Sequence, residues 1–120
     1  MDKIATFETA KNDVKKFCTD RDWDQFHGAK DLAIGLITEA SELLEHFRFK
    51  TDEQIRQILR SKEKQAEIRH ELADTLFFLL RFAQMFEIDL SDALFEKMAR
   101  NALKYPVDKS KGRNAKYDEL

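Results

Sequence analysis

The sequence is poor in residues that break secondary structure or build covalent cross-links. Its 120 residues include three glycines, one proline and one cysteine. So few glycines and prolines cannot supply the many turns of a β-sandwich or barrel, and we therefore expect an all-α protein. The single thiol, Cys18, excludes both an internal disulfide and a thiolate metal cage, and we expect it to be inert.

Long apolar runs and a surplus of one charge are also missing. The longest purely apolar run, Leu76 to Leu80, is far shorter than the roughly 20 residues that cross a bilayer. The formal net charge is -2, without the excess of Lys and Arg that nucleic-acid binding requires. We therefore expect neither a membrane nor a nucleic acid as a partner. One cysteine and a start without an apolar signal region predict a cytoplasmic protein.

Apolar spacing and capping residues predict four helices. Leu32, Leu36 and Leu43 recur at helical intervals within a segment from about Lys30 to Phe47. The others are expected at Ile4 to Cys18, at Glu53 to Phe86 with a pause near Ser61, and from a cap at Asp89 or Ser91 to Tyr105. An aromatic-rich connector, Thr19 to Gly28, follows the first helix. The sequence thus predicts a four-helix bundle in one domain of residues 1–105, followed by a C-terminal tail of residues 106–120.

Four short helices bury little apolar area when they fold alone. Exposed apolar helix faces favour a partner, and a second copy of the chain is the simplest one. We therefore expect a homodimer or homotetramer.

Two pairs of acids occupy helix faces that should be buried. At 100° per residue, Glu39 falls in the same stripe as Leu36, and Glu42 lies beside it one turn later. Glu71 and Asp74 repeat this spacing in the third helical segment. An unpaired buried carboxylate is unfavourable, and clustered acids raise one another's pKa. The pattern predicts that something cationic lies among these acids, whereas Glu45 and Glu67 are expected to be solvated.

Three sources of positive charge remain open at this point. Lys30, Arg69 or Arg81 can form structural ion pairs with the acids. A metal held by oxygen alone would be Mg²⁺ or Mn²⁺ in preference to Zn²⁺. A di-iron centre needs two Glu-x-x-His motifs, and the sequence has one, Glu67 to His70. Each histidine is therefore expected to be a surface or packing residue, and a non-enzymatic helical interaction module stays an alternative.

The order of these motifs resembles that of the MazG-like, all-α nucleoside triphosphate pyrophosphohydrolases. Glu39-x-x-Glu42 followed by Glu71-x-x-Asp74 is similar to the ExxE and ExxD signature of the family. The segments 21–27, 101–107 and 112–117 look like the dCTP pyrophosphatase branch. The resemblance covers about Trp23 to Leu120 and is weak over the first helix.

The resemblance implies an enzyme that cleaves a nucleoside triphosphate between its α- and β-phosphates with Mg²⁺, giving the monophosphate and pyrophosphate. This reaction serves nucleotide-pool housecleaning, and dCTP or a modified dNTP is a possible substrate. By the same resemblance the catalytic metal ligands are Glu39, Glu42, Glu71 and Asp74. Glu42 or Glu39 would also orient or deprotonate the attacking water.

The resemblance also implies a set of substrate contacts. Asn101, Lys104 and Tyr105 would meet the sugar or the phosphates, and Arg113 and Lys116 could reach the phosphates. Trp23, His27, Phe49 and Phe78 would surround the base, since nucleobases stack on aromatic faces. Relatives often carry Trp in place of Phe49 and Tyr in place of Phe78, so the identity of the base stays open.

Overall fold

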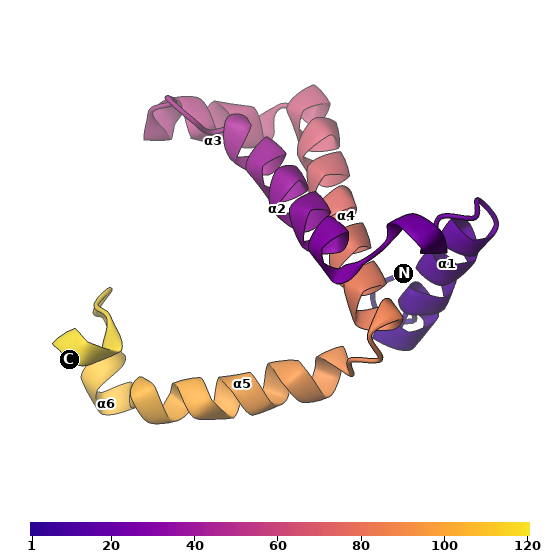
Figure 1. Ribbon diagram of the computed structural model, residues 1–120. Coiled ribbons are helices and arrows are strands. Elements are labelled where there is room, and N and C mark those ends of the chain that lie inside the picture. Colours follow the sequence, from indigo (N-terminus) through magenta and orange to yellow (C-terminus); the bar gives the residue numbers. More distant parts are fainter. The chain divides into compact units, whose positions relative to one another are not determined.

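The computed structural model describes residues 1–120, and it consists of helices without strands (Figure 1). The α-helices are α1 (Phe7–Thr19), α2 (Ala29–Glu45), α3 (Asp52–Arg60), α4 (Lys62–Met85), α5 (Leu90–Lys104) and α6 (Val107–Ser110); single 3₁₀ turns lie at Asp24–Phe26 and Tyr117–Glu119. The all-α prediction is confirmed. None of the helices combines the length and apolar character that crossing a membrane demands. The chain forms two compact units, Met1–Glu87 and Ile88–Leu120.

The third predicted helix is two helices because Ser61 leaves the helical conformation. Its backbone is extended, with φ -73° and ψ 123°, and its hydroxyl accepts the N–H of Lys64 at the start of α4. Helix α3 begins with a capping box in which Thr51 and Gln54 satisfy each other's backbone N–H groups. The predicted pause near Ser61 is confirmed. The predicted count of four helices is wrong, because this break and the short α6 after Pro106 raise the count to six.

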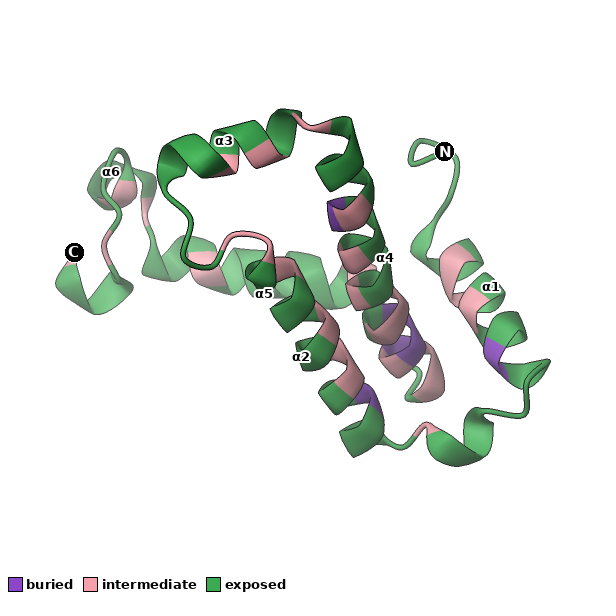
Figure 2. Ribbon diagram, turned by 90° about the horizontal axis from the view of Figure 1, so that it is seen from above, coloured by how far each residue is buried: buried purple, intermediate pink, exposed green.

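Helix α4 is the centre of the first unit. Helix α2 runs antiparallel beside it, α1 packs against its C-terminal half, and α3 leads into its first turn (Figures 1 and 2). The rings of Phe17 on α1 and Phe77 on α4 meet edge to face, with their centroids 5.8 Å apart. The buried apolar side chains come from three of these helices and are Cys18, Leu32, Ile68, Leu80 and Ala83.

Gly35 brings α2 and α4 close together. A methyl group at Gly35 would lie 2.8 Å from Cζ of Phe78 and nearer still to two other ring carbons. The ring of Phe78 therefore occupies the space that the missing side chain leaves free. Glu39 follows Gly35 by one helical turn and Asp74 precedes Phe78 by one turn, so this contact sets the spacing between the acid-bearing parts of both helices.

The second unit is built on α5. Its N-cap is Asp89, whose carboxylate accepts the N–H of Asp92 at 2.8 Å, and the helix ends just before Pro106. These bounds confirm the predicted fourth helix. The segment predicted as a tail contains α6 and the second 3₁₀ turn, and the ring of Tyr117 packs edge to face on Tyr105 at 6.2 Å. That residues 1–105 form one domain stays a prediction.

Candidate active site

Three of the four predicted metal ligands lie together between α2 and α4. One carboxylate oxygen from each of Glu39, Glu42 and Glu71 lies within 4.8 Å of the others. Glu39 and Glu71 are half-buried and Glu42 is exposed. The i, i+3 spacing on α2 and the antiparallel approach of α4 produce this group, which we call the acid cluster. Asp74 is exposed and lies outside it, although its negative charge acts on Glu39.

The acid cluster is electrostatically unfavourable as it stands. Loss of hydration raises the pKa of Glu39, and a hydrogen bond with Glu42 and the negative charges of Glu42, Asp74 and Glu71 raise it further. Loss of hydration also raises the pKa of Glu71, again with a contribution from Glu42, while His46 acts in the opposite direction. Both shifts mean that the cluster resists carrying its full negative charge, and that a cation would relieve it.

No lysine or arginine supplies that cation. None of the ion pairs in the structure joins a lysine or arginine to Glu39, Glu42, Glu71 or Asp74. Among the predicted partners, Lys30 and Arg69 are exposed and form no ion pair. The hypothesis that Arg81 neutralises these acids is wrong, because its guanidinium binds Asp24 and His27 instead. The structural ion-pair explanation of the acids is therefore overturned for all three residues.

His46 is a neighbour of the acids that sequence reasoning missed. Its side chain is 15% exposed, with Nε2 lying 3.6 Å from Glu71 and Nδ1 lying 3.8 Å from Glu67. Glu67 was expected to be solvated, and it is half-buried and pairs with Lys64 at 3.0 Å. The signal in the sequence was weak, since His46 follows α2 as its C-cap and only the approach of α4 brings the acids to it.

The donor set of the acid cluster fits a hard divalent cation. It consists of carboxylate oxygens, which Mg²⁺ and Mn²⁺ prefer, and it contains no thiolate and no imidazole. His70, the histidine of the single Glu-x-x-His motif, is exposed and does not belong to the group. The donor set therefore gives no support to a di-iron centre.

Trp23 and His27, both predicted to contact the base, lie on the connector between α1 and α2. Their rings meet edge to face with an interplanar angle of 63° and centroids 6.0 Å apart, and Trp23 also packs edge to face on Phe17 at 5.7 Å. The predicted loop contains a 3₁₀ turn, Asp24–Phe26, because the carbonyls of Trp23 and Asp24 accept the N–H groups of Phe26 and His27. Trp23 is 37% exposed and His27 is half-buried, so both rings retain accessible surface.

The other two predicted base contacts differ from each other in burial. Phe49 is 90% exposed in a left-handed backbone conformation with φ 62°, and the guanidinium of Arg48 lies 4.6 Å from its ring centroid. Phe78 is half-buried against Gly35, with its ring edge to face on Phe77 at 5.5 Å. Phe78 thus has a packing role whatever else it contacts.

The predicted sugar and phosphate contacts all belong to the second unit, where some of them gather around Tyr117. The ammonium of Lys104 lies 4.8 Å from the Tyr117 ring centroid, and that of Lys116 lies 5.9 Å from it. Tyr105 packs on the same ring. Arg113 donates to the carbonyl of Glu119 at 3.5 Å, and Asn101 is half-buried on α5. The aromatic ring at the centre of this group was missed in the sequence.

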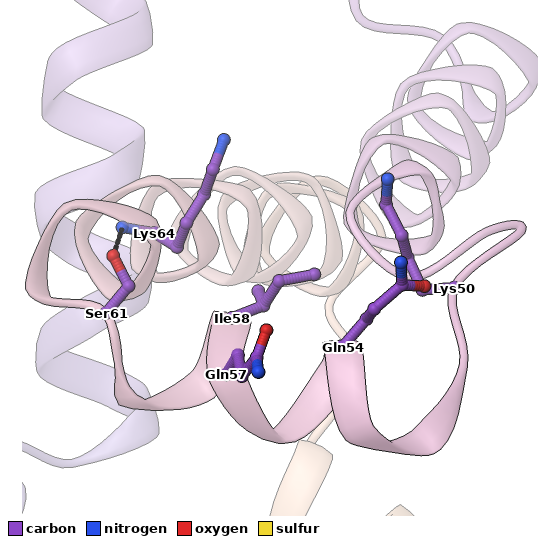
Figure 3. Close-up of a pocket in the computed structure, with 6 residues that line it drawn as sticks. All are labelled: Lys50, Gln54, Gln57, Ile58, Ser61 and Lys64. Atoms are coloured by element: carbon purple, nitrogen blue, oxygen red, sulfur yellow. Dashed lines mark hydrogen bonds between the residues drawn. The ribbon is translucent and has the colours of Figure 1, made fainter.

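A pocket of about 320 Å³ lies beside α3 (Figure 3). Its lining comes from the segment before α3, from α3 itself and from the start of α4: Lys50, Gln54, Gln57, Ile58, Ser61 and Lys64. No residue of the acid cluster lines it, and neither does any predicted substrate contact. The pocket is therefore separate from the candidate active site.

Solved structures and relatives identify the class of protein that this fold and these acids define. A pyrophosphatase from Archaeoglobus fulgidus has a similar structure, with a TM-score of 0.76, 31% sequence identity, and 82% of this chain and 91% of that chain covered. The dCTP pyrophosphatase 1 of Bos taurus is 36% identical over 115 residues, and that of Homo sapiens is 34% identical; each match covers 96% of this chain and 68% of the relative.

Residues 34–120 match the MazG-like family, and the chain belongs to it. The protein is therefore an enzyme, a hydrolase of the nucleoside triphosphate pyrophosphatase class. Members of this family generally use a divalent metal. The predicted family, all-α fold and enzyme class are confirmed, and a non-enzymatic interaction module is wrong.

Proposed function

We propose that this chain is a Mg²⁺-dependent pyrophosphohydrolase of (deoxy)nucleoside triphosphates that cleaves between the α- and β-phosphates. The products are the nucleoside monophosphate and pyrophosphate, and the role is nucleotide-pool housecleaning. The observation that carries the proposal is the acid cluster, because it gathers carboxylates with raised pKa values and no lysine or arginine partner. Relatives named dCTP pyrophosphatase make dCTP, or a modified form of it, the proposed substrate.

The proposed metal ligands are Glu39, Glu42, Glu71 and Asp74. A bound divalent cation offsets the charge of a triphosphate and of the transition state for phosphoryl transfer. Glu42 or Glu39 orients the attacking water or accepts its proton as a general base. The His46 ring lies between Glu67 and Glu71, with one nitrogen near each carboxylate. This contact limits the positions that the Glu71 carboxylate can take.

The proposed substrate contacts fall into two groups, one for the base and one for the sugar and phosphates. Aromatic rings suit the base, and these are Trp23, His27, Phe49 and Phe78. Cationic and hydrogen-bonding side chains suit the sugar and phosphates, and these are Asn101, Lys104, Tyr105, Arg113 and Lys116. Support comes from the exposure of Trp23 and Phe49 and from the paired ammonium groups around Tyr117.

Self-association is also part of the proposal. Apolar side chains on α2 and α4 are left largely exposed in the single chain: Ile34 is 52% exposed, Ile37 70%, Leu72 52% and Leu76 47%. Burying them in a homodimer or homotetramer removes apolar surface from water. Sedimentation velocity should give a mass that is a multiple of the 14.1 kDa chain; a monomer at all concentrations would contradict it. The predicted cytoplasmic location stays a prediction.

A product analysis tests the proposed reaction. The protein is incubated with each canonical dNTP and NTP and with 5-methyl-dCTP, with Mg²⁺, with Mn²⁺, and with a chelator in place of metal. We expect monophosphate and pyrophosphate in equal amounts, with dCTP or its modified form turned over fastest, and no product with the chelator. Diphosphate and inorganic phosphate as products would disprove cleavage at the α–β bond, and equal rates with the chelator would disprove the metal requirement.

A further inference from the structure

Arg81 on α4 is the one charged residue whose side chain is completely buried. Its guanidinium uses three nitrogens on three partners. Nε donates to Nδ1 of His27 at 2.9 Å, Nη1 donates to Gln84 at 2.5 Å, and Nη2 binds the carboxylate of Asp24. Two of these partners belong to the connector that carries Trp23. The connector is therefore held to α4 by one buried cation.

The contact with Arg81 determines where the proton of His27 lies. A guanidinium is protonated at all relevant pH values and can only donate, so Nδ1 of His27 must accept. A neutral imidazole has one accepting and one donating nitrogen, which leaves the proton on Nε2. Burial lowers the pKa of His27 and the charge of Arg81 lowers it further, against weaker opposing effects of Asp24 and Asp31. His27 is thus neutral, and its remaining nitrogen is a hydrogen-bond donor.

This donor belongs to a segment already suited to a base. Trp23 lies at the other end of the same 3₁₀ turn, and its ring meets the imidazole edge to face with the centroids 6.0 Å apart. Asp24, between the two aromatic residues, is anchored by Arg81. One buried side chain therefore fixes both the position of an aromatic ring and the direction of a hydrogen bond.

We propose that Arg81 is a positioning residue for base selection, which acts by keeping Nε2–H of His27 as a donor to the edge of the nucleobase. This inference rests on the proposed function and refines its substrate. A fixed donor placed opposite N3 of the base pairs with cytosine, whose N3 is an acceptor, and meets a second donor in uracil or thymine, whose N3 carries a hydrogen.

The first test measures the tautomer and needs no substrate. In protein with ¹⁵N-labelled histidine, long-range ¹H–¹⁵N spectra show which ring nitrogen carries the proton. We expect His27 to be the Nε2–H form in the unaltered protein and a mixture of forms in Arg81→Met, which fills similar space without a donor. His46 and His70 are internal controls whose signals should stay unchanged. An unchanged His27 tautomer in the variant would overturn the inference.

The second test separates base selection from general folding. Hydrolysis of dCTP, dUTP and a base-free deoxyribose triphosphate is measured with Mg²⁺. In Arg81→Met we expect KM for dCTP to rise about tenfold with kcat within about threefold, and the preference for dCTP over dUTP to shrink. KM for the base-free substrate should stay constant. An equal rise for all three substrates would show a merely structural role and would overturn the inference.

Two further arms keep the outcomes distinct. If Arg81→Met does not fold by circular dichroism, Arg81→Gln keeps a polar side chain near Asp24 and offers His27 an acceptor as well as a donor, so both tautomers are accommodated and the same shifts in tautomer and KM are expected. If the unaltered protein hydrolyses none of these triphosphates, the proposed function fails, and the assignment of Arg81 to base selection fails with it. If hydrolysis occurs and the preference for dCTP is unchanged in both variants, the inference alone is wrong.

Discussion

The charged side chains on the two halves of α4 differ in whether a partner of opposite charge balances them. Toward its N-terminus, Glu71 joins Glu39 and Glu42 in a cluster of like charges that no lysine or arginine balances. Toward its C-terminus, Arg81 is buried completely and every nitrogen of its guanidinium has a partner. Arg81 lies deeper than the acids, of which Glu39 and Glu71 are half-buried and Glu42 is exposed, and yet it is the deeper charge that is fully paired.

The comparison shows how to tell structural charge from functional charge. A folded protein tolerates a buried charge when hydrogen bonds and an opposite charge replace its hydration, and Arg81 satisfies this condition. The acid cluster lacks a lysine or arginine partner, and a bound cation would have to supply the opposite charge. The raised pKa values of Glu39 and Glu71 reflect lost hydration and this missing positive charge. The unbalanced charge of the acid cluster therefore indicates where a ligand binds. The balanced charge of Arg81 indicates a structural role in holding the connector on α4.

The largest expected effect follows from Glu39→Gln, which keeps the shape of the side chain and removes its charge. We expect hydrolysis to fall at least about a hundredfold, a loss of about 2.7 kcal/mol in transition-state stabilisation. Without metal, the thermal stability should stay equal or rise, because repulsion within the acid cluster is relieved. Pyrophosphate release with Mg²⁺ and thermal unfolding in a chelator measure the two effects.

Glu45→Gln is the matched control for this experiment. Glu45 lies on the same helix, is 62% exposed and pairs with Arg48 at 3.3 Å outside the acid cluster. Its replacement should leave hydrolysis nearly unchanged. A marked loss of metal-free stability in Glu39→Gln would indicate a structural ion pair and would contradict the distinction between the two halves of α4.

The next largest effect is on stability and concerns the C-terminal half of α4, where Arg81 is paired. It compares two aspartates whose side chains are equally exposed. The side chains of Asp24 and Asp20 are both 53% exposed, but Asp24 pairs with the buried Arg81 and Asp20 with Lys16, which is 77% exposed. Asp24→Asn should lower the free energy of unfolding by about 1–2 kcal/mol, since Arg81 loses its counter-charge in the interior. Asp20→Asn should change little, because exposed pairs contribute little. Urea unfolding of both variants measures the two changes in the free energy of unfolding. Equal losses would show that the burial of the basic partner does not matter.

The smallest effect is a pH dependence of opposite sign in the two halves. The folded-state pKa of Glu39 lies above its ordinary value of 4.5, so its contribution to metal-free stability is lost as pH rises through the raised pKa. The folded-state pKa of His27 lies below its ordinary value of 6.5, so its contribution is present above 6.5 and is lost as pH falls through the lowered pKa. Unfolding in a chelator between about pH 4 and 8 should show Glu39→Gln gaining stability over the unaltered protein as pH rises. A constant difference would refute the raised pKa.

Much of the fold was readable from local patterns. Helical spacing, the pause near Ser61 and the cap at Asp89 predicted where helices begin and break, because caps act through bonds within a few residues. The helix count was wrong where a one-turn helix after Pro106 has too few residues for a periodic pattern. The acid pairs were visible for the same local reason, since i, i+3 spacing places two side chains on one helix face.

The residues that contact each buried or half-buried charged side chain could not be predicted from such local patterns. Arg81 was one of three candidate partners of the acids, yet Asp24 and His27 bind it from a connector more than 50 residues earlier. His46 was assigned to surface or packing, and it faces Glu67 and Glu71 only because α2 and α4 are antiparallel. Contacts of this kind depend on how helices pack and not on spacing along one of them.

The amino-acid sequence by itself determined that this chain is helical, which residues begin and end most helices, and that two pairs of acids share helix faces. These properties come from interactions within one turn of chain, so they need no knowledge of the fold. Only the tertiary structure decided that Glu71 joins Glu39 and Glu42, and that Arg81 serves the connector instead of the acids. The physical reason is that the energy of a charge depends on every group that replaces its water, and those groups arrive from distant parts of the chain.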